Sequence, residues 1–238
     1  MELAKILVLC GGKATRMHPV TTDLPKSLVR VNGRAFIDYQ LWFLKRAGFK
    51  KVILCVGFLG NLIKMHVGDG KQFGLEVSYS FDGETPLGTA GSIKKAVGDS
   101  SAPFFVTFGD SYLPIDYMKV QRKFLDDPFS ALMVILKNQN TTHRNNIIFD
   151  GTRILKYDKN DANATYIDYG LSMFYPSVFD SVPYSYDVDL GCVIEGLINN
   201  KAMNHYVSLV ELYGVGNFQA VQKLEQLLTY SDIWGESI

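Results

Sequence analysis

The sequence has no surplus of charge of either sign. Among its 238 residues, 24 are Lys or Arg and 24 are Asp or Glu, so the formal net charge at pH 7 is zero. A protein that binds a nucleic-acid polymer or an anionic membrane surface usually carries a basic excess. The balance therefore argues against nucleic-acid and membrane partners. It leaves room for a local cluster of cations, because a sum does not record position.

Cysteines and long apolar runs are also scarce. The three cysteines, Cys10, Cys55 and Cys192, are far apart and show no CxxC or metal-ligand spacing. We expect them to be small buried side chains in a reducing compartment. No apolar run approaches 18 residues, and residues 1–5 lead directly into a strand-like run rather than a signal peptide. These features predict a cytoplasmic protein.

Apolar residues are plentiful, and their spacing predicts the fold class. Hydrophobic residues make up 47% of the chain, which is enough for a sizeable core. Runs typical of buried parallel strands alternate with helical patterns in the first half. The strands are expected at residues 6–10, 52–56, 75–81 and 104–108, and the helices at 36–47, 59–67 and 89–97. This rhythm predicts an α/β fold, with a mostly parallel sheet flanked by helices on both faces.

The second half continues with strands and helices and shows no repeat or linker. Strands are expected at residues 129–137, 146–157 and 169–175, and helices at 191–199 and 218–229. We therefore expect one domain over residues 1–238. Its first half would bind a ligand at the carboxyl ends of the strands, and its second half would close over that ligand.

A glycine-containing loop follows the first strand directly. Gly11 and Gly12 allow backbone amides to approach an anion closely, and Lys13 and Arg16 add positive charge, with the Arg fork suited to phosphate oxygens. The loop is neither a Walker A motif nor GxGxxG. Taken alone, it is also compatible with a tight strand-to-helix turn whose glycines serve only the turn.

Two further residues gain meaning beside this loop. Lys26 follows Pro25 on a short segment and is placed to reach a second phosphate, although an isolated Pro-Lys is usually a solvated turn. Asp110 ends an apolar strand after Gly109, where it could hold a cation or cap the next turn.

Taken in order, several segments resemble one enzyme family. They are Gly11-Gly12-x-x-Thr15-Arg16-Met17, Pro25-Lys26, Pro86-Leu87-Gly88-Thr89-Ala90-Gly91, Phe108-Gly109-Asp110, Tyr157-Asp158-Lys159 and Tyr166-Ile167-Asp168-Tyr169-Gly170. Together they resemble the signature of the sugar-1-phosphate nucleotidyltransferases, also called NDP-sugar pyrophosphorylases. The matches run from residue 6 to about residue 175. The resemblance implies a Rossmann-like, mixed sheet of the nucleotidyltransferase type. Residues 1–110 would form a nucleotide-binding half and residues 111–238 a sugar-phosphate-binding half.

The resemblance also implies a reaction and its residues. An oxygen of a sugar 1-phosphate attacks the α-phosphorus of an NTP, and pyrophosphate leaves in the presence of Mg²⁺. The implied catalytic residues are Arg16, Lys26 and Asp110, with Asp110 holding the Mg²⁺. The implied nucleotide-binding residues are Leu9, Gly11, Gly12, Lys13, Ala14, Thr15, Arg16, Glu84, Gly88 and Thr89. Those implied for the sugar phosphate are Lys159, Asp168, Tyr169 and Gly170.

The chain departs from the family pattern at two places that matter. Ala14 stands where the family commonly has glycine. Gly214 stands where many members supply a second metal carboxylate, and Glu211, three residues earlier, is the alternative donor. If neither position serves, Mg²⁺ has one protein carboxylate and depends more on phosphate oxygens and water.

The resemblance is greatest to mannose- and manno-heptose-1-phosphate guanylyltransferases, which implies GTP as donor and a role in cell-surface polysaccharide synthesis. Uridylyl or cytidylyl transfer is the alternative within the family. A catalytically silent nucleotide-sugar-binding homologue is the alternative outside it, favoured by Gly214. A homo-oligomer is compatible with the sequence, which does not determine the oligomeric state.

Overall fold

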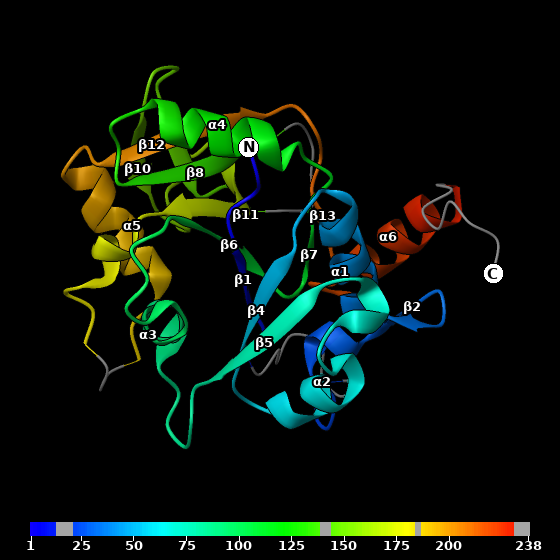
Figure 1. Ribbon diagram of the computed structural model, residues 1–238. Helices are drawn as coiled ribbons and strands as arrows, with labels where there is room; N and C mark the ends of the chain where they lie inside the picture. Colours follow the sequence, from blue (N-terminus) through cyan, green and yellow to red (C-terminus); the bar gives the residue numbers. More distant parts are fainter. Residues whose placement is uncertain (13–20, 139–143, 184–186, 231–238) are drawn as a thin grey trace.

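A nine-stranded mixed sheet runs through the protein (Figure 1). The structure is a computed structural model that describes residues 1–12, 21–138, 144–183 and 187–230. At the centre of the sheet lies β1 (Ile6–Leu9), which pairs in parallel with β4 (Lys51–Val56) and β6 (Phe104–Phe108). Strand β5 (Glu76–Phe81) pairs in parallel with β4. All four begin and end within two residues of the predicted strands. The side chains of β1, β4 and β6 are mostly buried between two helical layers, whereas β5 is an edge strand with only Val77 fully buried.

Antiparallel pairing joins the second half of the chain to this core. Strand β11 (Tyr166–Phe174) pairs with β6 on one side and with β8 (Ala131–Lys137) on the other. Strand β12 (Met203–Ser208) pairs in parallel with β8 and was not among the expected strands. The α/β fold with a mostly parallel mixed sheet is thus confirmed.

The single strand expected over residues 146–157 is wrong. The structure has two strands there, β9 (Ile147–Phe149) and β10 (Ile154–Tyr157), paired antiparallel as a hairpin. Asp150 causes the turn, because its Oδ1 accepts hydrogen bonds from the backbone N–H groups of Thr152 (2.8 Å) and Arg153 (2.9 Å). Gly151 supplies the positive φ of 98° that the turn requires.

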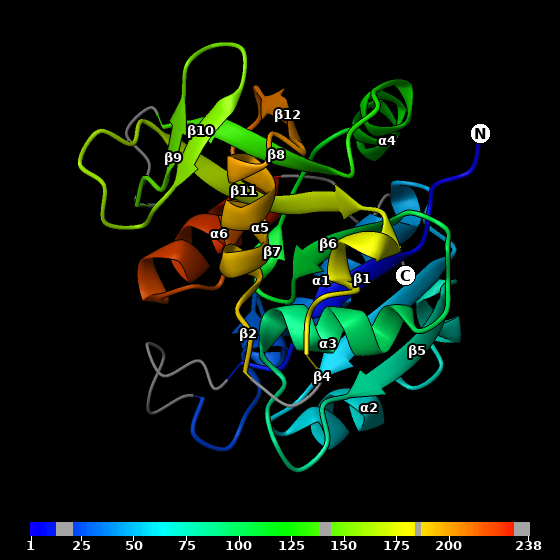
Figure 2. The ribbon, with the colours of Figure 1, turned by 90° about the vertical axis from the view of Figure 1, so that its left-hand side faces the viewer.

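Helices cover both faces of the sheet. Successive side chains of β1 point to opposite faces, so each face receives apolar side chains that a helix can cover. Ile6 and Val8 pack toward α1 (Phe36–Arg46), α2 (Gly60–Val67) and α4 (Tyr117–Asp126). Leu7 and Leu9 pack toward α3 (Gly88–Val97) and α5 (Leu190–Asn199). Figures 1 and 2 show α1 and α2 on the opposite side of β1 and β4 from α3. Helix α4 is absent from the expected elements, although its amphipathic face packs on the core through Val120 and Phe124.

Short elements complete the fold around the carboxyl edge of the sheet. A 3₁₀ helix spans Lys26–Leu28, and a small hairpin joins β2 (Arg30–Val31) to β3 (Arg34–Ala35). Strand β7 (Ser111–Tyr112) pairs with β13 (Tyr213–Gly214). The last helix, α6 (Phe218–Tyr230), packs Leu224 and Leu228 on α1, as its spacing predicts. Two further 3₁₀ turns lie at Lys71–Phe73 and Pro176–Phe179.

The structure also bears on the predictions about the cysteines and about membrane-spanning segments. Cys10 and Cys55 are buried, and no disulfide links the three cysteines, all of which lie in the described residues. The expectation of burial is wrong for Cys192, because its side chain is exposed on α5. Within the described residues, no helix combines the length and hydropathy needed to span a bilayer.

Candidate functional site

The larger of two pockets lies where four parallel strands end. This cavity of about 860 Å³ opens at the carboxyl ends of β1, β4, β5 and β6. Ligands of open α/β sheets bind at this edge, because the loops that follow the strands converge there. The residues that line the cavity are Leu9, Cys10, Gly11, Gly12, Lys26, Ser27, Cys55, Gly57, Phe58, Asp82, Gly83, Glu84, Pro86, Gly88, Thr89, Ser92, Phe108, Gly109, Asp110, Asp187 and Asp189.

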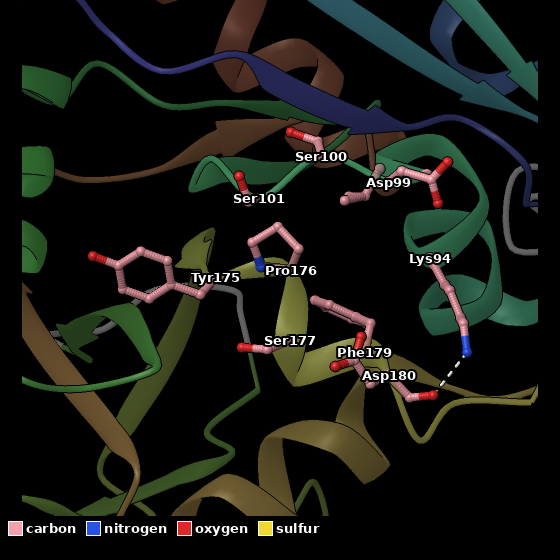
Figure 3. A pocket seen from close by; sticks show the side chains of 11 residues that line it. Lys94, Asp99, Ser100, Ser101, Tyr175, Pro176, Ser177, Phe179 and Asp180 are labelled. Carbon is pink, nitrogen blue, oxygen red and sulfur yellow. Dashed lines mark hydrogen bonds between the residues drawn. The ribbon is translucent and has the colours of Figure 1, made fainter.

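A second pocket, of about 520 Å³, lies at the opposite end of the sheet, where β6 begins and β11 ends. Lys94 is the only cation among the described residues that line it, and Figure 3 shows its ammonium directed at Asp180. Its Nζ donates hydrogen bonds to the carbonyl oxygens of Asp180 (2.8 Å) and Val182 (2.7 Å). With that cation bound to main chain, this pocket is poorly suited to an anion. The larger cavity is therefore the candidate site.

Glycines permit a close approach of two strand ends at the floor of the cavity. Gly11 follows β1 and Gly57 follows β4. A Cβ added to Gly57 would lie 3.0 Å from Asp82 Oδ2 and 3.1 Å from the carbonyl oxygen of Gly11. A side chain there would fill the space in which Gly11 and Gly57 meet. The predicted phosphate ligands Lys13, Ala14, Thr15 and Arg16 lie outside the described residues.

Lys26 and Asp110 form an ion pair inside the cavity. The Nζ of Lys26 lies 2.6 Å from Oδ2 of Asp110, and their side chains are 14% and 32% exposed. Lys26 opens the short 3₁₀ helix after Pro25, and Asp110 lies in the turn between β6 and β7. The fold thus brings together two residues that are 84 positions apart and that the sequence places in the catalytic set.

Main chain surrounds the Asp110 turn closely. The carbonyl oxygen of Asp110 accepts a hydrogen bond of 3.0 Å from the N–H of Val215. A Cβ on Gly214 would lie 2.4 Å from that same oxygen, so any side chain at position 214 requires the backbone to move. On the other side, a Cβ on Gly109 would lie 2.4 Å from Sγ of Cys10. Gly214 therefore serves the close contact between β13 and Asp110, and it supplies no metal ligand.

Glu211, the alternative carboxylate, is directed elsewhere. Its Oε1 accepts a hydrogen bond of 2.5 Å from Nζ of Lys223 on α6, and it is not among the residues that line the cavity. Within the described residues, no group of three or more His, Cys, Asp or Glu side chains is arranged to hold a metal. Asp110 is therefore the one carboxylate of the predicted metal set that faces the cavity.

Gly88 and Thr89, which were predicted to bind the nucleotide, line the cavity beneath a loop from the second half of the chain. Gly88 begins α3 with a positive φ of 71°, and a Cβ there would lie 2.4 Å from the carbonyl oxygen of Val188. The hydroxyl oxygen of Thr89 accepts a hydrogen bond of 2.6 Å from the N–H of Leu190. Thr89 thus fixes the loop that carries Asp187 and Asp189 over the start of α3. Glu84 is exposed in the preceding segment.

Asp82 is a site residue that the motifs did not identify. It follows β5, and its Oδ1 accepts a hydrogen bond of 2.5 Å from the Ser92 hydroxyl. Burial raises the pKa of this carboxyl group, which shows that its charge is poorly solvated. The rule that strand ends carry ligand-binding residues would have found Asp82, because β5 ends one residue before it. The same rule applies to Gly57, which follows β4.

The residues predicted for the sugar phosphate form a separate group beside the cavity, which none of them lines. Oδ1 of Asp168 accepts a hydrogen bond of 2.8 Å from the N–H of Gly170. Burial raises the pKa of Asp168 to about 6, while the charge of Lys159 acts in the opposite direction. A Cβ on Gly170 would lie 3.5 Å from the hydroxyl of Ser111, so this group adjoins the Asp110 turn.

Tyr169 and Lys159 differ in accessibility. Tyr169 is fully buried, and its hydroxyl donates a hydrogen bond of 3.4 Å to the carbonyl oxygen of Glu211. Its side chain therefore belongs to the core, and its backbone is what lies near Asp168 and Gly170. Lys159 is exposed in the turn after β10.

The described lining of the cavity is predominantly acidic. Lys26 is its only cation, whereas five carboxylates face it: Asp82, Glu84, Asp110, Asp187 and Asp189. A polyphosphate would be repelled by this set unless further positive charge accompanied it. The neutral total charge of the chain gave no indication of this local excess.

Comparisons with known proteins identify the family of this chain. A family model described as "Nucleotidyl transferase" matches residues 5–226. A UTP–glucose-1-phosphate uridylyltransferase of Synechocystis is 27% identical over 79% of this chain and 53% of its own length. A D-glycero-alpha-D-manno-heptose 1-phosphate guanylyltransferase of Campylobacter jejuni is 34% identical over 58% of this chain and 59% of its own length. The chain thus spans little more than half the length of these curated relatives.

A solved structure has the same fold. It is a putative glucose-1-phosphate thymidylyltransferase from Bacillus anthracis in complex with a sucrose, with a TM-score of 0.82 and 16% identity over 97% of this chain and 96% of that chain. The expected nucleotidyltransferase type of fold is confirmed by this likeness.

The half-buried carboxylate of Asp168 predicts a pH-dependent stability. Its pKa is about 6 in the folded protein against 3.8 as the ordinary value, so the native state binds more protons between these values. The free energy of unfolding therefore falls as the pH rises from about 4 to about 6. Asp168→Asn keeps an oxygen for the Gly170 N–H and removes the buried charge. We expect this variant to melt at a higher temperature than wild type at pH 7.5, with a difference that shrinks toward pH 4.

Asp150→Asn is the control with the opposite sign. Hydrogen bonds from Thr152 and Arg153 lower the pKa of Asp150 to about 2, so its charge stabilises the fold above its ordinary pKa. Thermal unfolding followed by fluorimetry, applied to both variants and to wild type, measures these differences. At pH 7.5 the melting temperature of Asp150→Asn should lie below that of wild type. An Asp168→Asn variant that also melts below wild type at pH 7.5 contradicts the raised pKa of a poorly solvated Asp168 carboxylate.

Proposed function

Because the chain belongs to the nucleotidyl transferase family, we propose that it transfers a nucleotidyl group from an NTP to a sugar 1-phosphate, releasing pyrophosphate and an NDP-sugar. The observation that carries this proposal is the Lys26–Asp110 pair of 2.6 Å at the carboxyl edge of the sheet. A lysine and a carboxylate held together in a cavity of about 860 Å³ suit a reaction of phosphates.

The chemistry requires positioning and charge stabilisation, and no covalent enzyme intermediate. An oxygen of the sugar phosphate forms a bond to the α-phosphorus as the bond to the pyrophosphate oxygen breaks. Lys26 donates to the α-phosphate oxygens, where negative charge develops. The backbone at Gly11 and Gly12 approaches the triphosphate without side-chain obstruction, and Lys13 to Arg16 are proposed to complete its binding.

The residues present fit a magnesium ion. Asp110 offers oxygen ligands in the cavity, with Oδ2 near Lys26 and Oδ1 accepting a hydrogen bond of 3.2 Å from the Ser111 hydroxyl. Mg²⁺ in phosphate-transferring sites binds through one or two carboxylates plus substrate phosphates, so a single Asp110 suffices. When bound, the ion neutralises charge on the phosphates, which the acidic cavity makes necessary.

The sugar phosphate is proposed to bind across β11. Asp168 lies beside Gly170, which adjoins Ser111 next to Asp110, so a sugar held there has its phosphate near the α-phosphate. The Asp168 carboxylate would accept hydrogen bonds from sugar hydroxyls, and the exposed Lys159 would approach the sugar's phosphate.

Guanine is the base that this cavity suits best. Asp82 and Glu84 are acceptors that line the cavity, and Asp82 is held beside α3 by the Ser92 hydroxyl. Guanine presents two adjacent N–H donors on its Watson–Crick edge, which a carboxylate accepts together. Uracil presents one N–H between two oxygens that a carboxylate repels. We therefore propose GTP as donor and a mannose- or heptose-type 1-phosphate as acceptor, for cell-surface polysaccharide synthesis. UTP and CTP are the alternatives, and the expected cytoplasmic location stays a prediction.

A nucleotide-sugar-binding homologue without turnover is the second candidate. Gly214 favours it, because position 214 provides no second carboxylate. The intact pair of Lys26 and Asp110 favours an active enzyme.

Pyrophosphate release tests the proposed function directly. With Mg²⁺, four NTPs and a series of sugar 1-phosphates, we expect release to be fastest with GTP. Asp110→Asn should lower kcat by about 100-fold or more, since it removes the charged oxygen ligand. Measurable nucleotide binding without release from any pair would refute an active enzyme in favour of the silent homologue.

Lys26→Ala separates transition-state stabilisation from substrate binding. If Lys26 acts on charge that develops at the α-phosphate, kcat should fall by about 10²- to 10³-fold while KM for the sugar phosphate changes little. Steady-state kinetics with either substrate varied measure both quantities. A large rise in that KM with unchanged kcat would instead assign Lys26 to sugar-phosphate binding.

Asp82→Asn tests the choice of base. The amide keeps the shape of the carboxylate but presents N–H groups to the N–H donors of guanine. The kcat/KM for GTP should therefore fall by about 10- to 100-fold. The same variant with UTP is the internal control and should lose little or gain. Equal losses for GTP and UTP would show that Asp82 does not select the base.

A further inference from the structure

Helix α1 holds the Asp110 turn from behind through one side chain. Gln40 lies on α1 with only 4% of its surface exposed. Its Nε2 donates hydrogen bonds to the carbonyl oxygens of Phe108 and Ser111, each at 2.8 Å. These two carbonyls flank Gly109 and Asp110, so a single amide group spans the turn that carries the carboxylate.

The orientation of this amide follows from its partners. Both neighbours are carbonyl oxygens, which only the NH₂ end of the amide can satisfy. The Oε1 of Gln40 is left buried with no hydrogen-bond partner. A buried acceptor without a partner costs about 1–3 kcal/mol. An apolar side chain of similar length would avoid that cost but would leave the carbonyl oxygens of Phe108 and Ser111 without this donor, so the glutamine is explained by its bond to the turn rather than by packing.

Main-chain groups make further hydrogen bonds to the backbone of the turn. The N–H of Gly109 donates to the carbonyl of Leu9 (2.9 Å), and the N–H of Val215 donates to the carbonyl of Asp110 (3.0 Å). These bonds tie the turn to β1 and to the end of β13. Gln40 holds the turn from a third side, that of α1, which Figure 1 shows beside β4 and β7. With the backbone held from three sides, the direction in which the Asp110 carboxylate points is restricted.

We propose that Gln40 is a positioning residue for Asp110. By bridging Phe108 and Ser111, it holds the carboxylate toward the cavity, where Lys26 meets it. Gln40 itself touches neither substrate nor metal. The proposal rests on the proposed role of Asp110 as a metal ligand, and it adds that the ligand's orientation depends on a buried amide that does not line the cavity.

A buried glutamine elsewhere provides a matched control. Gln121 on α4 is 3% exposed and also bridges two backbone groups. Its Oε1 accepts from the N–H of Ala4 (2.7 Å), and its Nε2 donates to the carbonyl of Glu2 (2.8 Å). Gln121→Met thus removes the same number of backbone contacts, of similar burial, from residues outside the cavity lining.

The test compares metal binding in the full-length variants. Mn²⁺ is titrated by water proton relaxation, in the presence of the α,β-methylene analogue of the triphosphate that releases pyrophosphate fastest. Gln40→Met should weaken Mn²⁺ binding and raise the half-saturating Mg²⁺ concentration by about 10- to 100-fold, the usual effect of losing a residue that orients a metal ligand. The KM for the sugar 1-phosphate should change less than about twofold, because Asp168 and Lys159 are unaltered. Gln121→Met should leave Mn²⁺ binding unchanged whatever its melting temperature.

A donor-preserving variant separates orientation from packing. Gln40→His, assayed at pH 8 where the imidazole is neutral, keeps an uncharged N–H donor toward the same carbonyls, so its Mn²⁺ affinity should lie nearer to wild type than that of Gln40→Met. A Gln40→His variant as weak as Gln40→Met, or equal effects of Gln40→Met and Gln121→Met, would overturn the proposal.

Asp110→Asn distinguishes failure of this proposal from failure of the proposed function. Unchanged Mn²⁺ binding in Asp110→Asn would remove Asp110 from the metal site and would overturn its metal role and the positioning role of Gln40, whereas pyrophosphate release by wild type would still support the proposed transfer reaction. Loss of binding in Asp110→Asn together with wild-type binding in Gln40→Met would overturn the positioning role alone.

Discussion

The site depends on how closely β1, β13 and α1 pack around the turn that carries Asp110. Gly109 lies against Cys10, and Gly214 lies against the carbonyl oxygen of Asp110, at distances that leave no room for a Cβ. The turn between β6 and β7 is therefore held by β1 and β13, and Gln40 holds it from α1. This packing explains why a carboxylate at position 214 is absent. The space that it would need is occupied by the backbone that fixes Asp110.

The electrostatics of the cavity follow from the same convergence of strands. Several strand ends and the loop before α5 bring five carboxylates to one cavity, with Lys26 as the only cation among its described lining residues. These carboxylates favour a ligand that has hydrogen-bond donors at one end. At its other end, the ligand's negative charge must be neutralised by a bound cation. A nucleoside triphosphate with a divalent cation has both properties, which connects the acidity of the pocket with the chemistry proposed for Lys26 and Asp110.

Much of the fold was predictable, because burial leaves a local pattern in the sequence. The parallel strands β1, β4 and β6 were found as continuous apolar runs, and α1, α2, α3 and α6 as helical spacings. The hairpin of β9 and β10 was missed, because its turn depends on Asp150 accepting two backbone N–H groups, which the apolar pattern does not show. Lys26 and Asp110, which the structure brings together, were selected from motifs. Asp82 was missed, although it follows a predicted strand, and Tyr169 entered the site list although its side chain lies in the core.

The sequence by itself determined the elements and the residue types available at their ends. The alternation of apolar runs specified a parallel core, and Gly11 after β1 marked a place where backbone is approached closely. Only the tertiary structure decided which of these ends meet. It paired Lys26 with Asp110, directed Glu211 to Lys223, and placed Gln40 behind a turn 68 residues away. The physical reason is that periodicity records how each residue is buried, whereas a site is formed by strand pairing and helix packing between residues far apart in the chain.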